Sequence, residues 1–294
     1  MNKISQQEPK LIRQGSVDFS VGYKVQTTWK FQEALMFTLE GLGATMFFVS
    51  FLFGQLNGAL LGLVILMASG ALLLVHLGNP RNMIYVMANF RHSWMSRGAV
   101  LIPVFIVLGL ISVALLGSNS ALIGGMANTV LTVFFLLLSI FILFKSGLVM
   151  HSFPAISLWN SSLLPILFAF NGLASGAVLF TLYPGRLPPD FYWVLPTVIG
   201  LFLTSLMFYL STSGRAGLGA VVSLNLISKR YFTSFYVVGI FAGTVMPMII
   251  GLHFAMWPTQ TTMPFIFLMT VARVVGDVAI RNVILKVGVY DKVL

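Results

Sequence analysis

Cysteine is absent from all 294 residues of the chain. Its absence excludes disulfides, thiolate chemistry, c-type haem attachment and iron–sulfur clusters ligated by this chain. Charge is also scarce, because Asp, Glu, Lys and Arg make up 8% of the residues, against about 25% in soluble domains. So few charges cannot cover the surface of a soluble globule of this size. The same composition excludes a disordered chain.

What the chain has in abundance is apolar runs of membrane-spanning length. Hydrophobic residues make up 58% of it, and the mean hydropathy is +0.96. A helix needs about 20 apolar residues to cross a bilayer core of about 30 Å. We therefore predict an all-α integral membrane protein with eight transmembrane helices in two four-helix bundles, seven or nine spans being the alternatives. The predicted spans lie near 34–54, 57–77, 98–117, 126–150, 160–182, 191–211, 235–255 and 262–285.

Two regions follow from this pattern. Residues 1–33 form a polar N-terminal arm, which has neither the short apolar segment nor the small-residue cleavage site of a signal peptide. Residues 34–294 form the membrane domain, with an N-terminal half at 34–150 and a C-terminal half at 160–285.

Basic residues give the chain a net charge of +10. In a soluble protein such an excess suggests nucleic acid, but here the basic residues lie between apolar spans, so we predict no nucleic-acid partner. With eight spans, 15 of the 17 Lys and Arg residues, Lys145 and Arg281 among them, fall on the side of both termini. Arg186 falls on the other side, and Arg273 lies within the last span. The positive-inside rule then places both termini in the cytoplasm and the protein in the inner (cytoplasmic) membrane.

Acidic residues inside the first span are the first functional candidates. An ionisable residue within a membrane costs about 2.5–3.5 kcal/mol on insertion scales and usually marks a site. Glu40 lies about two turns into the span and is such a residue. Glu33 lies at the boundary of the span, where a solvated interfacial residue is the simpler interpretation.

The last span contains a second group of charges. Arg273, Asp277 and Arg281 follow one another at intervals of four, so they share one face of a helix. Asp277 can pair with either arginine. The group is either an ion-pair clamp within the bundle or a proton relay or gate.

Histidine is the remaining candidate for redox chemistry. His76 ends the second span, whereas His253 lies at the opposite end of the seventh span and His151 lies beyond the fourth. A b-type haem held by two histidines needs both on facing helices at similar depth, so the sequence does not favour one. Taken alone, His76 is a hydrogen-bonding anchor at the membrane surface.

Four segments in order resemble the NrfD-type membrane subunits, a family that includes the membrane anchors of polysulfide reductase and DMSO reductase. The first is GLGATMFF in span one, and the second is HLGNP followed by SWMSRGA between spans two and three. The third is SGLVMHSFPAISLWNSSLLPILFAFNGLASGA, residues 146–177, and the fourth is VVGDVAIRNVILKVGVYD at the end. The resemblance extends from about Trp29 to Asp291.

The resemblance implies a subunit that oxidises or reduces a quinone, menaquinone or ubiquinone, and ligates no haem or iron–sulfur cluster itself. Residues 34–150 would be the quinone-binding half. Electrons would pass to or from a docked ferredoxin-like subunit with four [4Fe–4S] clusters, which serves a molybdenum or tungsten pterin catalytic subunit. The redox partner would dock on the predicted cytoplasmic side, where His76 lies.

The resemblance also implies roles for individual residues. His76 would contact a quinone carbonyl or quinol hydroxyl, and an ordinary pKa of about 6.5 suits a group that exchanges protons at neutral pH. Glu40 would be a second proton carrier and Glu33 a weaker one. The residues expected in the pocket or the docking surface are Asn79, Arg81, Ser96 and Arg97. A tyrosine in span four serves some quinone sites of the family, and residues 126–150 contain none, so the hydrogen-bond pattern of the pocket cannot be transferred.

Two other functions fit some of these residues. A secondary transporter would use Glu40, Asp277 and Arg273 as ion or substrate ligands. Transporters often contain inverted repeats, and the chain shows no convincing repeat. A b-type cytochrome anchor is the other alternative, and the positions of the histidines count against it.

Overall fold

A computed structural model of the protein describes residues 23–76, 81–117, 125–183, 188 and 190–291. Eight helices in this part are long and apolar enough to cross a membrane, which confirms the predicted number. The protein is therefore an all-α, multi-pass membrane protein. Its spans are α1 (Phe31–Leu52), α2 (Leu56–His76), α4 (Trp94–Gly117), α5 (Gly125–His151), α6 (Leu163–Phe180), α7 (Phe191–Ser213), the π-helical η4 (Thr233–Val245) continued by α9 (Met246–Met256), and α10 (Met263–Lys286).

Short elements lie between the spans where the sequence predicted only loops. They are α3 (Asn82–Ala88), α8 (Leu218–Lys229) and the 3-10 turn η5 (Pro258–Gln260). The sequence missed α3 and α8 because a window of about 20 apolar residues cannot detect helices of 7 and 12 residues. In addition α4 begins at Trp94 rather than near residue 98, so Ser96 and Arg97 lie within a helix.

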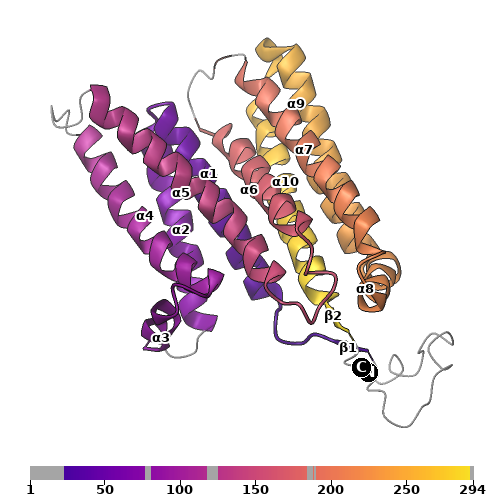
Figure 1. Cartoon of the computed structure of the whole chain (residues 1–294). Coiled ribbons are helices and arrows are strands. Elements are labelled where there is room, and N and C mark those ends of the chain that lie inside the picture. Colours follow the sequence, from indigo (N-terminus) through magenta and orange to yellow (C-terminus); the bar gives the residue numbers. More distant parts are fainter. Residues whose placement is uncertain (1–22, 77–80, 118–124, 184–187, 189, 292–294) are drawn as a thin grey trace, which may run out of the picture.

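Helix α1 lies at the centre of the bundle and contacts α2, α5, α6 and α10. Figure 1 shows α2, α4 and α5 on one side of the molecule and α7, α9 and α10 on the other. Two glycines let the two sides meet closely, because a Cβ on Gly41 of α1 would lie 2.9 Å from the Cα of Gly172 in α6. Small residues at such crossings are typical of helices that pack in lipid.

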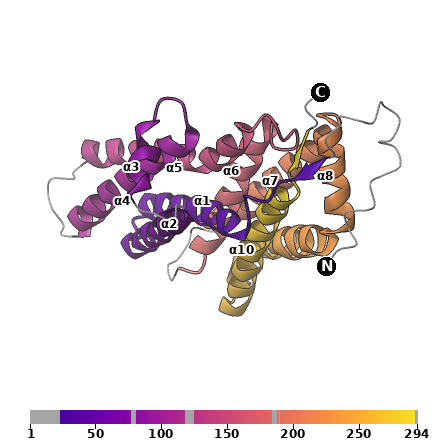
Figure 2. The same cartoon turned by 90° about the horizontal axis from the view of Figure 1, so that it is seen from below.

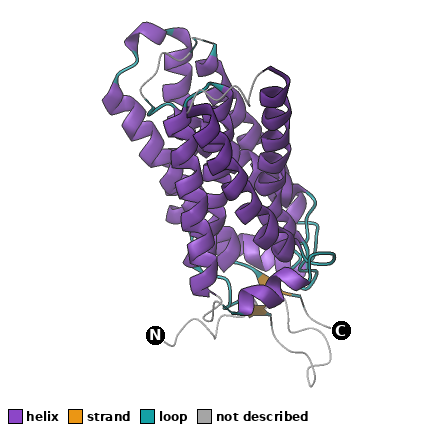
Figure 3. Ribbon diagram, turned by 90° about the vertical axis from the view of Figure 1, so that its left-hand side faces the viewer, coloured by secondary structure: helices purple, strands orange, loops and turns teal. Residues whose placement is uncertain are grey.

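Both described ends of the chain lie at one end of the bundle. The strand β1 (Lys24–Val25) pairs antiparallel with β2 (Val289–Tyr290), with Lys24 opposite Tyr290. Figures 1 and 3 show this strand pair at the same end as α3 and α8, and the view from below in Figure 2 places α3 and α8 at opposite edges of that end. We call this end the strand end. Its position in the cytoplasm stays a prediction.

Aromatic packing fixes α1 against the helices of the N-terminal half. The ring of Phe47 meets Phe105 of α4 edge to face at 4.9 Å between centroids and Phe135 of α5 at 4.8 Å. Edge-to-face pairs at such distances stabilise a core beyond their buried area. This cluster holds α4 and α5 in place beside the cavity described next.

Candidate functional site

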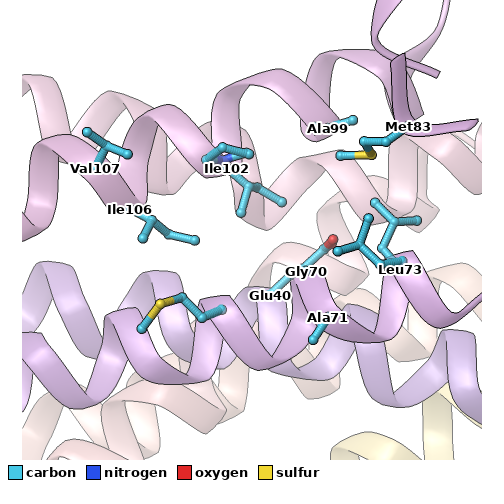
Figure 4. Close-up of a pocket in the computed structure, with 13 residues that line it drawn as sticks. Glu40, Gly70, Ala71, Leu73, Met83, Ala99, Ile102, Ile106 and Val107 are labelled. Carbon is cyan, nitrogen blue, oxygen red and sulfur yellow. The ribbon is translucent and has the colours of Figure 1, made fainter. Parts of the chain in front are cut away.

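A cavity of about 340 Å³ lies between α2 and α4. Met67, Leu74 and Val107 at its rim are 42%, 38% and 55% exposed, so it opens on the side of the molecule that faces lipid. Figure 4 shows the two helices as opposite walls. We call this cavity the lateral pocket. It is lined by Glu40, Met67, Gly70, Ala71, Leu73, Leu74, Met83, Gly98, Ala99, Ile102, Pro103, Ile106 and Val107.

Small residues on the facing helices create the space. Gly70 and Ala71 line the pocket from α2, and Gly98 and Ala99 line it from α4. A Cβ added at Gly70 would have no heavy atom within 4 Å. Larger side chains at these positions would fill the gap between the helices, so the two pairs of small residues make it a cavity.

Among the described residues of the lining, Glu40 has the only ionisable side chain. It reaches from α1 toward the space between α2 and α4, as Figure 4 shows, and is 2% exposed. Its Oε1 accepts a hydrogen bond from Nζ of Lys145 at 2.5 Å. Its Oε2 is buried and has no hydrogen-bond partner among the described residues. Glu40, which lines the pocket, therefore has one buried carboxylate oxygen whose acceptor capacity is unused.

Lys145 is the charged partner of Glu40 that sequence reasoning missed. We counted it among the basic residues at the membrane surface, but it is 3% exposed and inside α5. Arg281, counted with it, is 0% exposed. Lys145 and Arg281 can be buried because each has an acidic partner in the interior of the bundle. The signal was present in the sequence, because Lys145 lies within the predicted span 126–150 and pairing would explain a charge there.

Glu33 and His76 form a second acid–base pair at the strand end. Nδ1 of His76 lies 2.7 Å from Oε1 of Glu33. The other oxygen, Oε2, accepts a hydrogen bond from the backbone N–H of Lys30 at 2.6 Å, which caps the first turn of α1. Glu33 is 4% exposed, so its interpretation as a solvated interfacial residue is wrong. The imidazole of His76 and the backbone N–H of Lys30 hold its buried carboxylate in place.

His76 lies beyond the lateral pocket rather than in its lining. The pocket is lined from the last turn of α2 by Leu73 and Leu74, and the side chain of His76 is 36% exposed. Glu33 and Glu40 are seven residues apart on α1, which puts them on the same face and roughly 10 Å apart along the axis. Helix α1 thus carries one acid in the pocket and one at the strand end, bonded to the predicted histidine.

The other residues predicted for the pocket or docking surface gather around α3 and the start of α4. Arg97 donates hydrogen bonds to the carbonyl oxygens of Phe90 and Arg91 at 3.2 and 2.8 Å, and so fastens the segment between the two helices. Ser96 is 2% exposed, and Arg81 is exposed just before α3. Asn79 lies outside the described residues.

The three charges predicted on α10 are brought together with two polar residues of α6. Arg281 donates to Oδ1 of Asp277 at 2.6 Å, and so does Nδ2 of Asn171, also at 2.6 Å. Ser175 donates to the other oxygen, Oδ2, at 2.7 Å. Arg273 does not pair with Asp277 but donates to the side-chain and main-chain oxygens of Asn171. Of the two pairings that the sequence allowed, the structure has the one with Arg281, and Asn171 lies between Asp277 and Arg273.

The segment η4 also takes part in this cluster. Nη1 of Arg273 donates to the carbonyl oxygen of Gly243 at 3.0 Å and to Oγ1 of Thr244 at 3.3 Å. Helices of π type are rare and usually short, and here one of 13 residues passes α10 where Gly243 meets Gly276. The buried cluster therefore ties α6, η4 and α10 together.

No group of three or more His, Asp and Glu side chains suited to a metal ion occurs in the described parts of the chain. Comparison with known proteins gives one family. Its profile, described as Polysulphide reductase, NrfD, matches residues 22–290, which is nearly the whole chain. No curated protein sequence matches. The family match agrees with the eight spans and covers the four segments that resemble the family, and the chain belongs to the NrfD (polysulphide reductase) family.

Proposed function

We propose that the lateral pocket binds a membrane quinone or quinol and that the chain exchanges electrons between the quinone pool and a docked iron–sulfur subunit. As an NrfD-family protein it is a membrane subunit of the respiratory-reductase type. The proposal also includes a four-cluster [4Fe–4S] ferredoxin-like partner, a molybdenum or tungsten pterin catalytic subunit and a location in the inner membrane. The observation that carries the proposal is the unpaired Oε2 of Glu40 in an apolar pocket open to lipid.

The residues of the pocket fit a quinone. Ligand pockets commonly measure about 300–1,000 Å³ and combine an apolar lining with a few placed polar groups, and this one has about 340 Å³ and a single carboxylate. Its opening between α2 and α4 lets an isoprenoid tail remain in the bilayer. A bound quinone supplies two-electron, two-proton chemistry. The buried acceptor on Glu40 suits the hydroxyl of a quinol, because that hydroxyl satisfies an oxygen that otherwise has no donor.

Two acids of α1, Glu40 and Glu33, would carry the protons together with His76 of α2. Glu40 accepts a proton at Oε2, within the pocket, while Oε1 remains bonded to Lys145. The Glu33–His76 pair exchanges protons with water, since the imidazole is 36% exposed. His76 therefore acts where protons leave the site for water, which we call the exit of the site.

The depth of the pocket favours a redox partner at the strand end. Leu73 is three residues from the end of α2, Gly98 is four residues from the start of α4, and Glu40 is nine residues from the start of α1. At about 1.5 Å per residue these positions lie roughly 5–14 Å below that end. An iron–sulfur subunit docked there would be close to the pocket, whereas one at the opposite end would be separated from it by most of the membrane.

Blocking the pocket tests the proposal. The probe is 2-heptyl-4-hydroxyquinoline N-oxide, a fluorescent quinol analogue, titrated against the complex purified from native membranes. We expect one site in the wild-type chain and none in Gly70→Phe, because the ring would occupy the cavity. Gly200→Phe is the matched control, since Gly200 lies on α7 and also has no heavy atom within 4 Å of an added Cβ. Equal binding by both variants would show that the ligand binds elsewhere.

Purification of the complex in mild detergent tests the partners. We expect a cysteine-rich ferredoxin-like chain and a pterin-binding chain to copurify, as identified by mass spectrometry. Recovery of this chain alone, in stoichiometric homo-oligomers, would contradict the assignment and favour a transporter that uses Glu40, Asp277 and Arg273.

A further inference from the structure

We propose that Lys145 is a positioning residue of the lateral pocket and that it holds Glu40 as an anion with Oε2 turned to the ligand. The lack of a side chain at Gly98 leaves the space that Lys145 needs for this contact. The proposal rests on the proposed quinone site. It assigns a function to a charge that does not itself line the pocket.

The side chain of Lys145 passes directly behind the wall of the pocket. A Cβ built on Gly98 would overlap Cδ of Lys145 and lie 3.1 Å from its Nζ and 3.2 Å from its Cε. Gly98 itself lines the pocket. The backbone of α4 at this position therefore has the ligand space on one side and the lysine on the other. Any larger residue at position 98 would displace the lysine from Glu40.

The ion pair decides in which form Glu40 meets a ligand. A buried carboxylate without a partner becomes protonated rather than remain charged in an apolar environment. Nζ of Lys145, 2.5 Å from Oε1, provides the opposite charge inside the bundle. The same Nζ lies over the ring of Phe37, 5.7 Å from its centroid, which also favours the charged lysine. As an anion Glu40 is acceptor-only. A quinol hydroxyl can then donate to Oε2, whereas a protonated Glu40 would present a competing donor.

No other charged group takes over this role. The titratable and charged groups on the elements packed around Glu40 form no ion pair with it in the described part of the chain. Nη2 of Arg281 lies 3.6 Å from a Cβ built on Gly41, the residue after Glu40, but Asp277 neutralises this arginine. The groups concerned are Glu33 of α1, His76 of α2, Arg97 of α4, His151 of α5, and Arg273, Asp277, Arg281 and Lys286 of α10.

Infrared spectroscopy of the purified complex measures the proton on Glu40 directly. We expect no protonated-carboxyl C=O band from Glu40 in the wild-type complex at pH 7, and such a band in Lys145→Met and in Gly98→Ala. Loss of the band in the corresponding double variants with Glu40→Gln assigns it. Gly70→Ala is the matched control, because it adds the same methyl group to the same pocket without meeting another atom, and it should show no band.

Turnover gives an independent measurement. In Lys145→Met the acid limb of the pH profile for menadiol oxidation should move to higher pH, with the rate at pH 7 lowered about tenfold per unit of displacement. A merely structural lysine would lower the rate at all pH values without moving the limb. If Lys145→Met does not fold, Gly98→Ala carries both measurements, because it leaves the lysine in place as a residue.

Each outcome bears on the proposal. A protonated Glu40 in the wild-type complex at pH 7, or no band and no displaced limb in both variants, overturns the role of Lys145 while leaving the quinone site intact if the N-oxide probe still binds. If the wild-type complex binds no probe, the proposed function fails and the role of Lys145 fails with it, whatever the infrared spectra show. Bands in the two variants, with wild-type probe binding and a displaced limb, support it.

Discussion

The molecule contains two buried carboxylates with opposite surroundings. Glu40 is bonded to Lys145 at 2.5 Å and Asp277 to Arg281 at 2.6 Å, and both acids are nearly inaccessible. Asp277 receives donors on both of its oxygens. Glu40 has one oxygen without a partner among the described residues, and that carboxylate faces a cavity. The same kind of ion pair is therefore complete in one half of the protein and incomplete in the other.

The difference separates a structural role from a binding role. Fully bonded polar networks in a low-dielectric interior make a fold rigid and specific, whereas an unsatisfied buried group requires an explanation. A ligand that donates a hydrogen bond provides that explanation at Glu40. Both oxygens of Asp277 already have donors, which favours the ion-pair clamp over the proton relay; in the same cluster Nε of Arg273 is buried without a hydrogen-bond partner among the described residues.

The largest effect is expected from breaking the cluster around Asp277. Asp277→Asn leaves Arg281 and Arg273 buried without a counter-charge, and removing one partner of a buried pair costs about 3–5 kcal/mol. We expect little folded protein, as measured by size-exclusion chromatography of detergent extracts and by the midpoint of thermal unfolding. A variant that folds as well as the wild type but no longer moves protons in sealed vesicles would restore the relay interpretation.

The incomplete pair should respond in the opposite way. Glu40→Gln keeps the size of the side chain and an oxygen that accepts from Lys145. A buried lysine left without a counter-charge can lose its proton, whereas a buried arginine cannot, so folded protein should remain. Loss of the proton acceptor should lower quinol oxidation about 100-fold or more. The measurement is menadiol oxidation by the complex, normalised to the amount of assembled chain. Ser139→Ala is the control, since its hydroxyl donates only to the carbonyl oxygen of Ala44. A matching loss of rate in both variants would contradict a specific role for Glu40.

Sequence reasoning went as far as hydropathy and local spacing allow. Eight spans could be predicted because each is a continuous apolar run, and the shared face of Arg273, Asp277 and Arg281 follows from intervals of four on one helix. The bond between Glu40 and Lys145 joins residues 105 positions apart. Such a contact depends on how α1 and α5 pack, and no pattern within either helix specifies it.

The same limit applies to the end of the site. His76 could be selected because it closes a span, and the family resemblance drew attention to it. Its partner Glu33 looked interfacial because hydropathy cannot show that the first turn of α1 is covered by α2. The lateral pocket was also beyond prediction, since Gly70 and Gly98 are ordinary packing residues until two facing helices leave space between them.

A smaller effect than at Glu40 is expected at the exit. His76→Gln keeps a hydrogen-bonding side chain beside Glu33 but removes the imidazole, which is the usual acid–base group in proton transfer. We expect quinol oxidation to fall about tenfold, with unchanged binding of the N-oxide probe, because His76 does not line the pocket. Stability should change by less than about 1 kcal/mol, as is usual for partly exposed pairs. Loss of probe binding would instead place His76 in contact with the ligand.

The smallest effect should come from removing one hydrogen-bond donor of Asp277. Ser175→Ala takes away the hydroxyl that donates to Oδ2 of Asp277 at 2.7 Å, while Asn171 and Arg281 stay bonded to Oδ1. A net loss of about 1 kcal/mol is the usual consequence of one such hydrogen bond. The thermal midpoint should fall slightly, with the pH profile of menadiol oxidation unchanged. Gly98→Ala is the counterpart at the incomplete pair, where the pH profile should move. A displaced profile in Ser175→Ala would mean that Asp277 exchanges protons during turnover, and the contrast between the two carboxylates would no longer hold.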